Sequence, residues 1–252
     1  MRNYAVQLPI LAYHSVLLDA STQFPHGWDP LETILYSRLC AQLDMFRAED
    51  WQSLPATGLG DPIALSSCKR KILFTFDDGH ESDLLAAEAL AERAFAAIFF
   101  IPCSNIGRPH FVSRDNIKRL CLNGFAVGSH GLTHTPLTHL SADLLWKELV
   151  ESKARLEDLV GQPVQDLAVP FGRYNRRVVE RAKDAGYTAI LTSKIDLASP
   201  GPGSCIFPRV PVKPRMTDSL VYALVKGSLL AKLRCRLQGN VRRATRVLPR
   251  QR

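Results

Sequence analysis

The stretch Lys71-Ile72-Leu73-Phe74-Thr75-Phe76-Asp77-Asp78-Gly79 joins an apolar run to two adjacent carboxylates and a glycine. The crowded apolar residues predict a buried strand over 71–76, which Gly79 ends. Asp77 and Asp78 therefore lie at the C-terminal end of a strand, where neighbouring side chains diverge. One carboxylate can bind a cation there while the other transfers protons, as metal-dependent hydrolases require. A simple turn with an Asx cap is the alternative for Asp-Asp-Gly alone.

Strands and helices alternate on both sides of this stretch. Apolar runs predict strands over 8–16, 71–76, 97–102, 125–128, 167–169, 187–191 and 206–212. Helical spacing and terminal signals predict helices over 30–50, 82–95, 114–123, 141–160, 176–185 and 217–237, and the connection 51–71 has room for one short strand. Such alternation favours a parallel sheet, and seven or eight such units in 252 residues favour closure into a barrel. Active sites in such barrels lie at the C-terminal ends of the strands.

A second polar motif, Gly128-Ser129-His130-Gly131-Leu132-Thr133-His134, directly follows the predicted strand 125–128. Two histidines four residues apart can both reach one metal ion, and histidine is a usual zinc ligand. The motif occupies the same topological place as Asp77 and Asp78. Two imidazoles and one carboxylate would leave positions open for water and a substrate oxygen. Alone, the histidine spacing is equally compatible with coincidence.

Three stretches, in this order, resemble motifs of the NodB-type polysaccharide deacetylases of carbohydrate esterase family 4: Thr75–Gly79, Ser129–His134 and Val169–Asn175. The similarity covers residues 8–212. It implies a distorted (β/α)7-8 barrel of the NodB-homology type, here with an extra C-terminal helix. Members of this family remove N-acetyl groups from amino sugars, so the implied substrate is an N-acylated amino sugar in a glycan or glycan precursor.

The resemblance also implies roles for individual residues. The first aspartate of the family's first motif is the catalytic base, which implies Asp77. The second aspartate and both histidines bind the metal, which implies Asp78, His130 and His134. The implied cofactor is a divalent metal, Zn²⁺ in the first place, with Co²⁺ or Ni²⁺ as alternatives. The third motif implies an oxyanion contact from the backbone near Pro170 and Phe171.

The sequence also departs from the family pattern. Ala168 stands where the third motif often has an arginine that orients the base, and no histidine follows His139 to supply the usual late general acid. The segment Leu11-Ala12-Tyr13-His14 resembles the opening strand of the branch that includes poly-N-acetylglucosamine deacetylases, which implies His14 as the acid. Arg209 is the candidate for orienting the base. A strand-end histidine and a surface arginine without catalytic roles are the alternatives.

The net charge of +8 originates near the C-terminus. Eight Lys or Arg residues and no acidic residue lie between Lys232 and Arg252, so the remaining residues are balanced. We therefore divide the chain into a barrel domain, 1–215, and an amphipathic helix with a basic tail, 216–252. The segment 217–252 is a candidate for peripheral contact with an anionic membrane, and a solubilising end or a helix packed on the barrel is the alternative. No nucleic acid is expected, because aromatic residues do not accompany the basic ones.

Compartment and rival functions follow from what the sequence lacks. No apolar run is long enough to cross a membrane, the N-terminus is a poor signal peptide, and the six cysteines form no Cys-x-x-Cys pair. We expect a cytoplasmic protein, either free or peripherally bound at the inner face of the membrane. The rival functions are a deformylase or other amidase acting on a lipid-linked sugar, and a non-catalytic barrel scaffold at a membrane or glycan.

Overall fold

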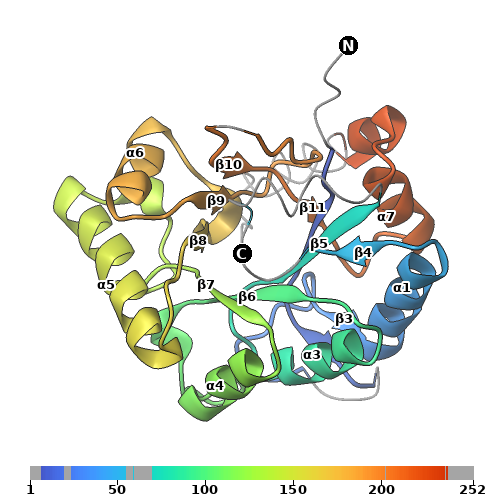
Figure 1. Cartoon of the computed structure of the whole chain (residues 1–252), viewed down its shortest axis with the longest axis horizontal. Helices are drawn as coiled ribbons and strands as arrows, with labels where there is room; N and C mark the ends of the chain where they lie inside the picture. The colour runs from blue at the N-terminus through green and yellow to red at the C-terminus, as the bar shows by residue number, and fades with distance from the viewer. Residues whose placement is uncertain are drawn as a thin grey trace, which may run out of the picture.

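A curled, parallel sheet surrounded by helices forms the body of the molecule in the computed structural model, which describes residues 7–19, 24–54, 59, 70–201, 203–235 and 237 (Figure 1). The strands are β1 (Ile10–Tyr13), β2 (Val16–Leu17), β3 (Ile34–Leu35), β4 (Gln52–Ser53), β5 (Lys71–Phe76), β6 (Ala97–Ile101), β7 (Ala126–Ser129), β8 (Asp166–Ala168), β9 (Ala189–Leu191), β10 (Ile206–Phe207) and β11 (Val210–Pro211). The α-helices are α1 (Tyr36–Ala48), α3 (Asp83–Ala91), α4 (Arg114–Leu122), α5 (Ala142–Val160), α6 (Arg176–Asp184) and α7 (Asp218–Val225). Short 3-10 helices cover η1 (Cys103–Asn105), η2 (Leu137–His139) and η3 (Pro170–Gly172).

The sheet returns on itself through one short segment near its end. The strand order is β10-β9-β8-β7-β6-β5-β1-β11, with every pair parallel. β10 and β11 therefore occupy opposite edges although only Pro208 and Arg209 separate them in the chain. The segment Ile206–Pro211 thus closes the ring, which confirms the predicted distorted (β/α)7-8 barrel. Arg209 lies at the closure.

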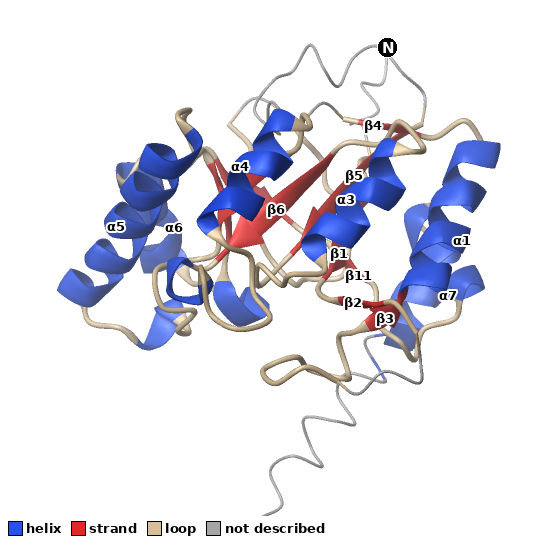
Figure 2. Ribbon diagram, turned by 90° about the horizontal axis from the view of Figure 1, so that it is seen from below, coloured by secondary structure: helices blue, strands red, loops and turns tan. Residues whose placement is uncertain are grey.

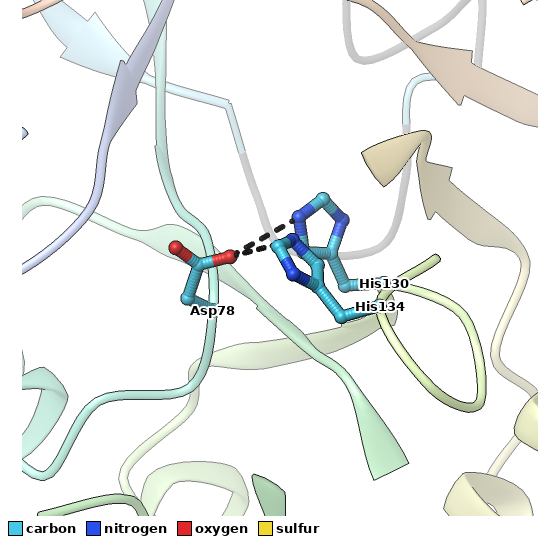
Figure 3. A group of neighbouring side chains, drawn as sticks. All are labelled: Asp78, His130 and His134. Atoms are coloured by element: carbon cyan, nitrogen blue, oxygen red, sulfur yellow. Dashed lines mark ion pairs between the residues drawn. The ribbon is translucent and has the colours of Figure 1, made fainter. Parts of the chain in front are cut away.

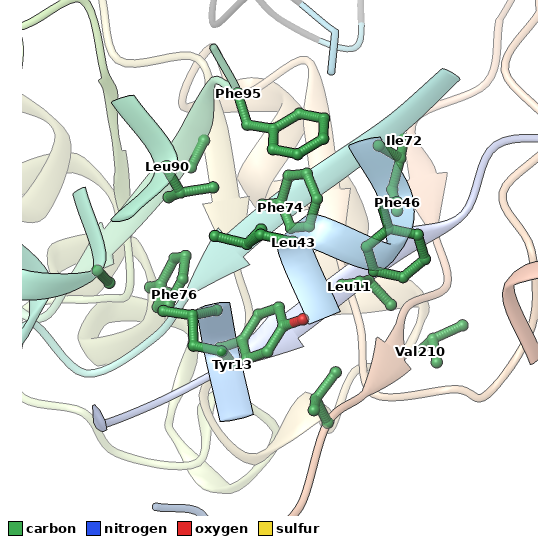
Figure 4. Packing of buried hydrophobic residues seen from close by; sticks show 14 of the residues in the cluster. Leu11, Tyr13, Leu43, Phe46, Ile72, Phe74, Phe76, Leu90, Phe95 and Val210 are labelled. Carbon is green, nitrogen blue, oxygen red and sulfur yellow. The ribbon is translucent and has the colours of Figure 1, made fainter. Parts of the chain in front are cut away.

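Both faces of the strands are buried, so apolar residues run along them almost without interruption. On β5, Phe74 and Phe76 point outward into a cluster that includes Tyr13, Leu43 and Phe46 from β1 and α1 (Figure 4). Leu73 points the other way, into a cluster to which β1, β6, β8, β9 and β10 also contribute. This second cluster fills the interior of the barrel. The alternation of the strand thereby decides which residues face inward.

Helices cover the outer face and begin and end where the sequence signals them. Figure 2 shows α3 and α4 side by side on the outside of the sheet. Ser141 caps α5 by accepting a hydrogen bond from the Leu144 amide, and Gly161 ends this helix in a left-handed conformation at φ +70°. Ser113, Asn175 and Thr217 cap α4, α6 and α7 in the same way. Local capping chemistry thus explains the predicted helix starts.

Four predicted boundaries are wrong. The helix predicted from residue 30 begins at Tyr36, because Asp29–Thr33 forms turns and β3 pairs with β2. The strand predicted over 8–16 is divided into β1 and β2, and the strand predicted over 206–212 is divided into β10 and β11. The helix predicted over 217–237 is interrupted at Gly227, which has φ +79°. Residues 55–58, 60–69 and most of the basic tail, 238–252, lie outside the described residues.

Candidate active site

The inward-facing register of four strands carries polar residues to one mouth of the barrel. Ile10 and Leu73 lie in the interior cluster, so His14 and Asp77, each an even number of residues further along, continue the same inward faces. Ala126 on β7 and Phe207 on β10 also contact the interior cluster, so by the same alternation His130 and Arg209 lie on inward faces. All these strands are parallel, so the polar residues beyond their C-terminal ends meet at one side of the barrel.

A sharp backbone turn then separates the two aspartates. Asp78 has φ +77° and Gly79 has φ +66°, a left-handed pair that is unusual for aspartate. The Asn105 side chain donates a hydrogen bond of 3.0 Å to the Asp78 carbonyl and fixes this turn. Asp77 consequently stays over the barrel interior, while Asp78 is directed to the histidine loop. The different roles expected of the two carboxylates have a structural basis in this turn.

Asp78, His130 and His134 converge on one point (Figure 3). Asp78 Oδ1 lies 3.1 Å from His134 Nε2 and 3.4 Å from His130 Nε2, and one ligand atom from each residue lies within 4.8 Å of the others. Asp78 Oδ1 is buried, yet it has no hydrogen-bond partner among the described residues. The His130 Nδ1 atom lies 2.7 Å from the Ala168 carbonyl, which fixes the ring and leaves Nε2 as the free ligand atom. This arrangement fits a divalent cation.

The charges of the site support the same conclusion. Burial by itself would raise the pKa of Asp78, but interactions with His130, His134 and His80 hold that pKa well below its usual value. Burial would lower the pKa of His130, but the negative charges of Asp77 and Asp78 raise it. Asp78 is therefore kept in its ionised form beside two imidazoles, and carboxylate oxygens and imidazole nitrogens are the atoms that bind cations such as zinc.

The loop between the two histidines is held from behind by Glu148 on α5. The buried carboxylate of Glu148 accepts hydrogen bonds from the amides of Leu132, at 2.8 Å, and Thr133, at 3.1 Å. The Thr133 hydroxyl donates to the same carboxylate at 2.5 Å. From the other side, Gly131 accepts a hydrogen bond from the Cys103 amide. The position of His134, which has a left-handed φ of +57°, is thus determined by its neighbours.

Arg209 reaches across the barrel to Asp77. Its Nη1 lies 2.8 Å from Asp77 Oδ1 and its Nη2 lies 2.7 Å from Oδ2, with 1% of the arginine and 3% of the aspartate exposed. Arg209 also donates to Thr75 and to the Thr192 carbonyl, and it packs over the Phe100 ring. Burial would raise the pKa of Asp77, but Arg209, followed by His130 and His14, lowers it overall. Asp77 is therefore ionised and fixed in orientation.

His14, which also interacts with the charge of Asp77, faces a second carboxylate. Its Nδ1 is 3.7 Å from Glu32 Oε2, and both atoms are buried without a hydrogen-bond partner among the described residues. The second Glu32 oxygen pairs with Lys213, which follows the closing segment. A small shift of either side chain would bring His14 Nδ1 and Glu32 Oε2 within hydrogen-bond distance. Such a bond through Nδ1 would leave His14 Nε2 free for the site.

Phe171 and Pro170 border the metal triad. Phe171 adopts φ +59°, is 56% exposed, and places its ring centroid 4.8 Å from that of His134. Pro170 is buried at the start of η3. The η3 segment thus lies against the metal-ligand loop, and the strained backbone of Phe171 adds to the left-handed residues Asp78 and His134 already found there.

Glu148 and Glu32 were missed by sequence reasoning. Glu148 lies inside a regular helix, and Glu32 lies in a stretch that the sequence predicts as helix, so neither carries a local signal. His80 packs between Trp28 and Phe111, and its Nε2 lies 3.7 Å from Asp78 Oδ2. Its position directly after the Asp-Asp-Gly turn is the sequence signal for its place at the site.

A family model for polysaccharide deacetylases matches residues 65–190, half of the chain. The putative polysaccharide deacetylase YxkH of Bacillus subtilis is 26% identical over 225 residues, which cover 87% of this chain and 76% of YxkH. The peptidoglycan-N-acetylglucosamine deacetylase PgdA of Listeria monocytogenes is 25% identical over 50% of this chain and 27% of PgdA. Among solved structures, the Streptococcus pyogenes deacetylase PplD has a TM-score of 0.75 at 22% identity, covering 88% of this chain and 99% of PplD.

These matches identify the class of protein. The likeness to PplD confirms the barrel fold, and Asp78, His130 and His134 lie close enough together at its mouth to hold one metal ion. The chain belongs to the polysaccharide deacetylase family. Family membership supports carbohydrate N-deacetylation as the type of reaction.

Proposed function

We propose that this chain is a metal-dependent deacetylase that hydrolyses the N-acetyl amide of an amino sugar in a glycan or glycan precursor. One observation carries the proposal: a buried, ionised carboxylate, Asp77, is held by Arg209 directly beside the triad of Asp78, His130 and His134. A proton acceptor and a cation site are thus adjacent but separate. Amide hydrolysis needs both, because the attacking water must lose a proton while the acyl oxygen gains negative charge.

The donor set favours Zn²⁺ as the cofactor, with Co²⁺ or Ni²⁺ as alternatives. Two imidazole nitrogens and one carboxylate oxygen are ligands that zinc accepts in catalytic sites with an open position. Asp78, His130 and His134 would hold the ion. When bound, it supplies a Lewis acid that makes a water molecule more acidic and polarises the acyl oxygen.

The protein's own groups divide the remaining work. Asp77 accepts the proton of the attacking water, and Arg209 keeps its two oxygens oriented for that transfer. A backbone N–H near Phe171, in the segment begun by Pro170, donates to the oxygen that becomes negative. His14, protonated and oriented through Glu32, donates a proton to the leaving amine. The carbon–nitrogen bond then breaks, releasing acetate and the free amino sugar.

The remaining parts of the proposal concern the substrate and the location of the protein in the cell. The basic segment 217–252 can contact anionic lipid peripherally. This contact favours a lipid-linked sugar at the inner face of a membrane as the substrate. The five described cysteines are free thiols, which supports a reducing, cytoplasmic environment. Within the described residues, none of the helices combines the length and the apolar character needed to cross a bilayer.

A deformylase would use the same groups, so the acyl group must be determined by experiment. The scaffold alternative is disfavoured by the unpartnered Asp78 oxygen between two histidines, an arrangement whose burial is unfavourable unless a cation binds.

The test combines metal content with amine release on a panel of N-acetylated and N-formylated sugars and sugar lipids. We expect stoichiometric metal in the wild type and in Asp77→Asn, with amine release reduced by about 10² to 10⁴ in the variant. His130→Ala should lose both metal and amine release, and His14→Gln should lose amine release alone. Full activity in Asp77→Asn would remove the assignment of the base. A metal-free, inactive wild type, even after zinc is added, would favour the scaffold.

A further inference from the structure

The helical segment after Gly227 presents four leucines to solvent. Leu229, Leu230, Leu233 and Leu237 are exposed by 74%, 80%, 53% and 66%, respectively. At about 100° of rotation per residue, these positions fall within an arc of about 100° on one side of the helix. We call these four residues the leucine face. It is a continuous apolar stripe rather than a set of scattered residues.

The opposite side of the same segment is attached to the barrel. Ala231 and Cys235 are buried in the cluster that contains β1, β5, α1 and α7. Lys232 makes an ion pair of 2.6 Å with Asp196, which also holds the segment in place. Because the inner side is already packed, the leucine face points away from the barrel. Rotating it inward would expose Ala231 and Cys235 and break the ion pair.

α7 provides an internal comparison. Three of its apolar residues, Val221, Leu224 and Val225, are buried against the barrel, and the others, Leu220, Tyr222 and Ala223, are partly buried against the same cluster. Elsewhere, exposed leucines such as Leu18 and Leu122 occur singly, which is normal for a protein surface. Four exposed leucines on one side of a single helix are unusual for a surface that faces water alone.

Charge indicates what covers the leucine face. Arg234 is exposed on the same segment, and the sequence continues with Arg236, Arg242, Arg243, Arg246, Arg250 and Arg252 without an acidic residue. A second copy of this chain would bring a second set of these cations to the same contact, which repulsion disfavours. An anionic bilayer accepts leucine side chains below its headgroups and cations at its surface.

We propose that the leucine face docks this protein onto an anionic membrane surface, with the neighbouring arginines contacting lipid phosphates. Docking of this kind is peripheral, since the segment lies along the surface and its other side stays on the barrel. It does not depend on the identity of the reaction. The contact would concentrate the protein at a membrane whether its substrate is lipid-linked or not.

The experiment measures co-sedimentation of the full chain with vesicles of equal parts phosphatidylglycerol and phosphatidylcholine, and with phosphatidylcholine alone. The test variant carries Leu229→Ser, Leu230→Ser and Leu233→Ser. The matched control carries Leu18→Ser, Leu122→Ser and Leu144→Ser, which are equally exposed leucines of other elements. We expect the test variant to partition onto the anionic vesicles at least about tenfold more weakly than the wild type, and the control to partition as the wild type does.

Three further results decide the proposal. Amine release from a soluble substrate should be the same in the test variant and the wild type, which shows that the barrel is intact. Equal sedimentation of the wild type with and without phosphatidylglycerol, or no sedimentation at all, overturns the proposal. So does a dimer, measured by light scattering without vesicles, that the test variant abolishes, because the leucine face would then belong to a second copy.

Discussion

Two sides of the barrel mouth differ in how firmly they are built. The metal side, consisting of Asp78, His130 and His134, has its ligand atoms within 4.8 Å of one another and its loop fixed by Glu148. The acid side, consisting of His14, Glu32 and Lys213, has His14 Nδ1 3.7 Å from its carboxylate and without a hydrogen-bond partner among the described residues. The metal side is preorganised, whereas the acid side has room to tighten when a substrate binds.

Asp77 and Arg209 form a buried ion pair next to the metal side. Asp77 precedes the metal ligand Asp78, and Arg209 belongs to the segment that closes the barrel. Their two hydrogen bonds therefore connect β5 to the closure as well as orienting the base. In the proposed mechanism this buried ion pair serves both proton transfer and structure, so breaking it should have the largest effect on activity and on stability.

Arg209→Met should lower amine release by about 100-fold and the free energy of unfolding by about 3 to 5 kcal/mol at neutral pH, because Asp77 keeps its buried charge but loses its partner. Arg209 holds the pKa of Asp77 below its usual value, so the stability that Asp77 contributes is present above the unfolded pKa and is lost as pH falls through the folded pKa. Without Arg209, burial raises the pKa of Asp77. The acidic limb of the kcat/KM profile should then move to higher pH.

Arg209→Lys and the double variant Arg209→Met with Asp77→Asn are the controls. Lysine keeps the charge but cannot form both hydrogen bonds, so its pH profile should shift less. The double variant removes the unpaired charge and should regain part of the lost free energy of unfolding, measured by denaturant titration. If the acidic limb of the kcat/KM profile did not shift in Arg209→Met, a group other than Asp77 would determine that limb.

The difference between the two sides also explains what could be predicted from the sequence. Asp77, Asp78, His130 and His134 follow buried strands directly, so a local pattern places them at the same end of the barrel. Arg209 is a sequence candidate for orienting Asp77, but the two are far apart in the chain, and only closure of the sheet brings them together. Glu148 and Glu32 depend on tertiary contacts alone. Strand alternation is local, whereas the residues that support a site are selected by packing.

The same limit applies to the fold. The strand β5 and the helix α5 begin and end as their apolar run and capping residues indicate. The division of the closing strand at Pro208 and of the last helix at Gly227 depends on which neighbours each half contacts. Consequently, the sequence predicts one amphipathic helix over 217–237, whereas the structure separates a packed helix from one with an exposed leucine face.

Glu148→Gln tests how firmly the metal side is held. The two backbone N–H groups donate to one carboxylate oxygen and the Thr133 hydroxyl donates to the other, so in glutamine one of these two sets of donors would face an NH₂ group, and the loop before His134 should loosen. We expect metal affinity to fall by about 10-fold to 100-fold, as is usual for residues that support metal ligands. Competition with a chromogenic chelator measures this affinity. Glu151→Gln on the same helix, which removes exposed ion pairs with Lys147 and Arg155, should leave it unchanged.

Glu32→Gln should have the smallest effect and should act on the acid side alone. Glu32 can orient His14 for proton donation, so its loss should lower kcat for amide hydrolysis by about tenfold while metal content and KM stay the same. Glu180→Gln, which breaks an exposed ion pair on α6, is the control.

The leaving group separates a proton-transfer role of Glu32 from a structural one. An amine must be protonated as it leaves, whereas the phenolate released from an aryl acetate ester leaves without a proton. Glu32→Gln and His14→Gln should therefore impair amide hydrolysis but hardly affect hydrolysis of such an ester. Glu148→Gln, which acts through the metal side, should impair both reactions in the same proportion. If Glu32→Gln reduced ester and amide hydrolysis equally, Glu32 would support the shape of the mouth, and the acid side would not be a separate functional unit.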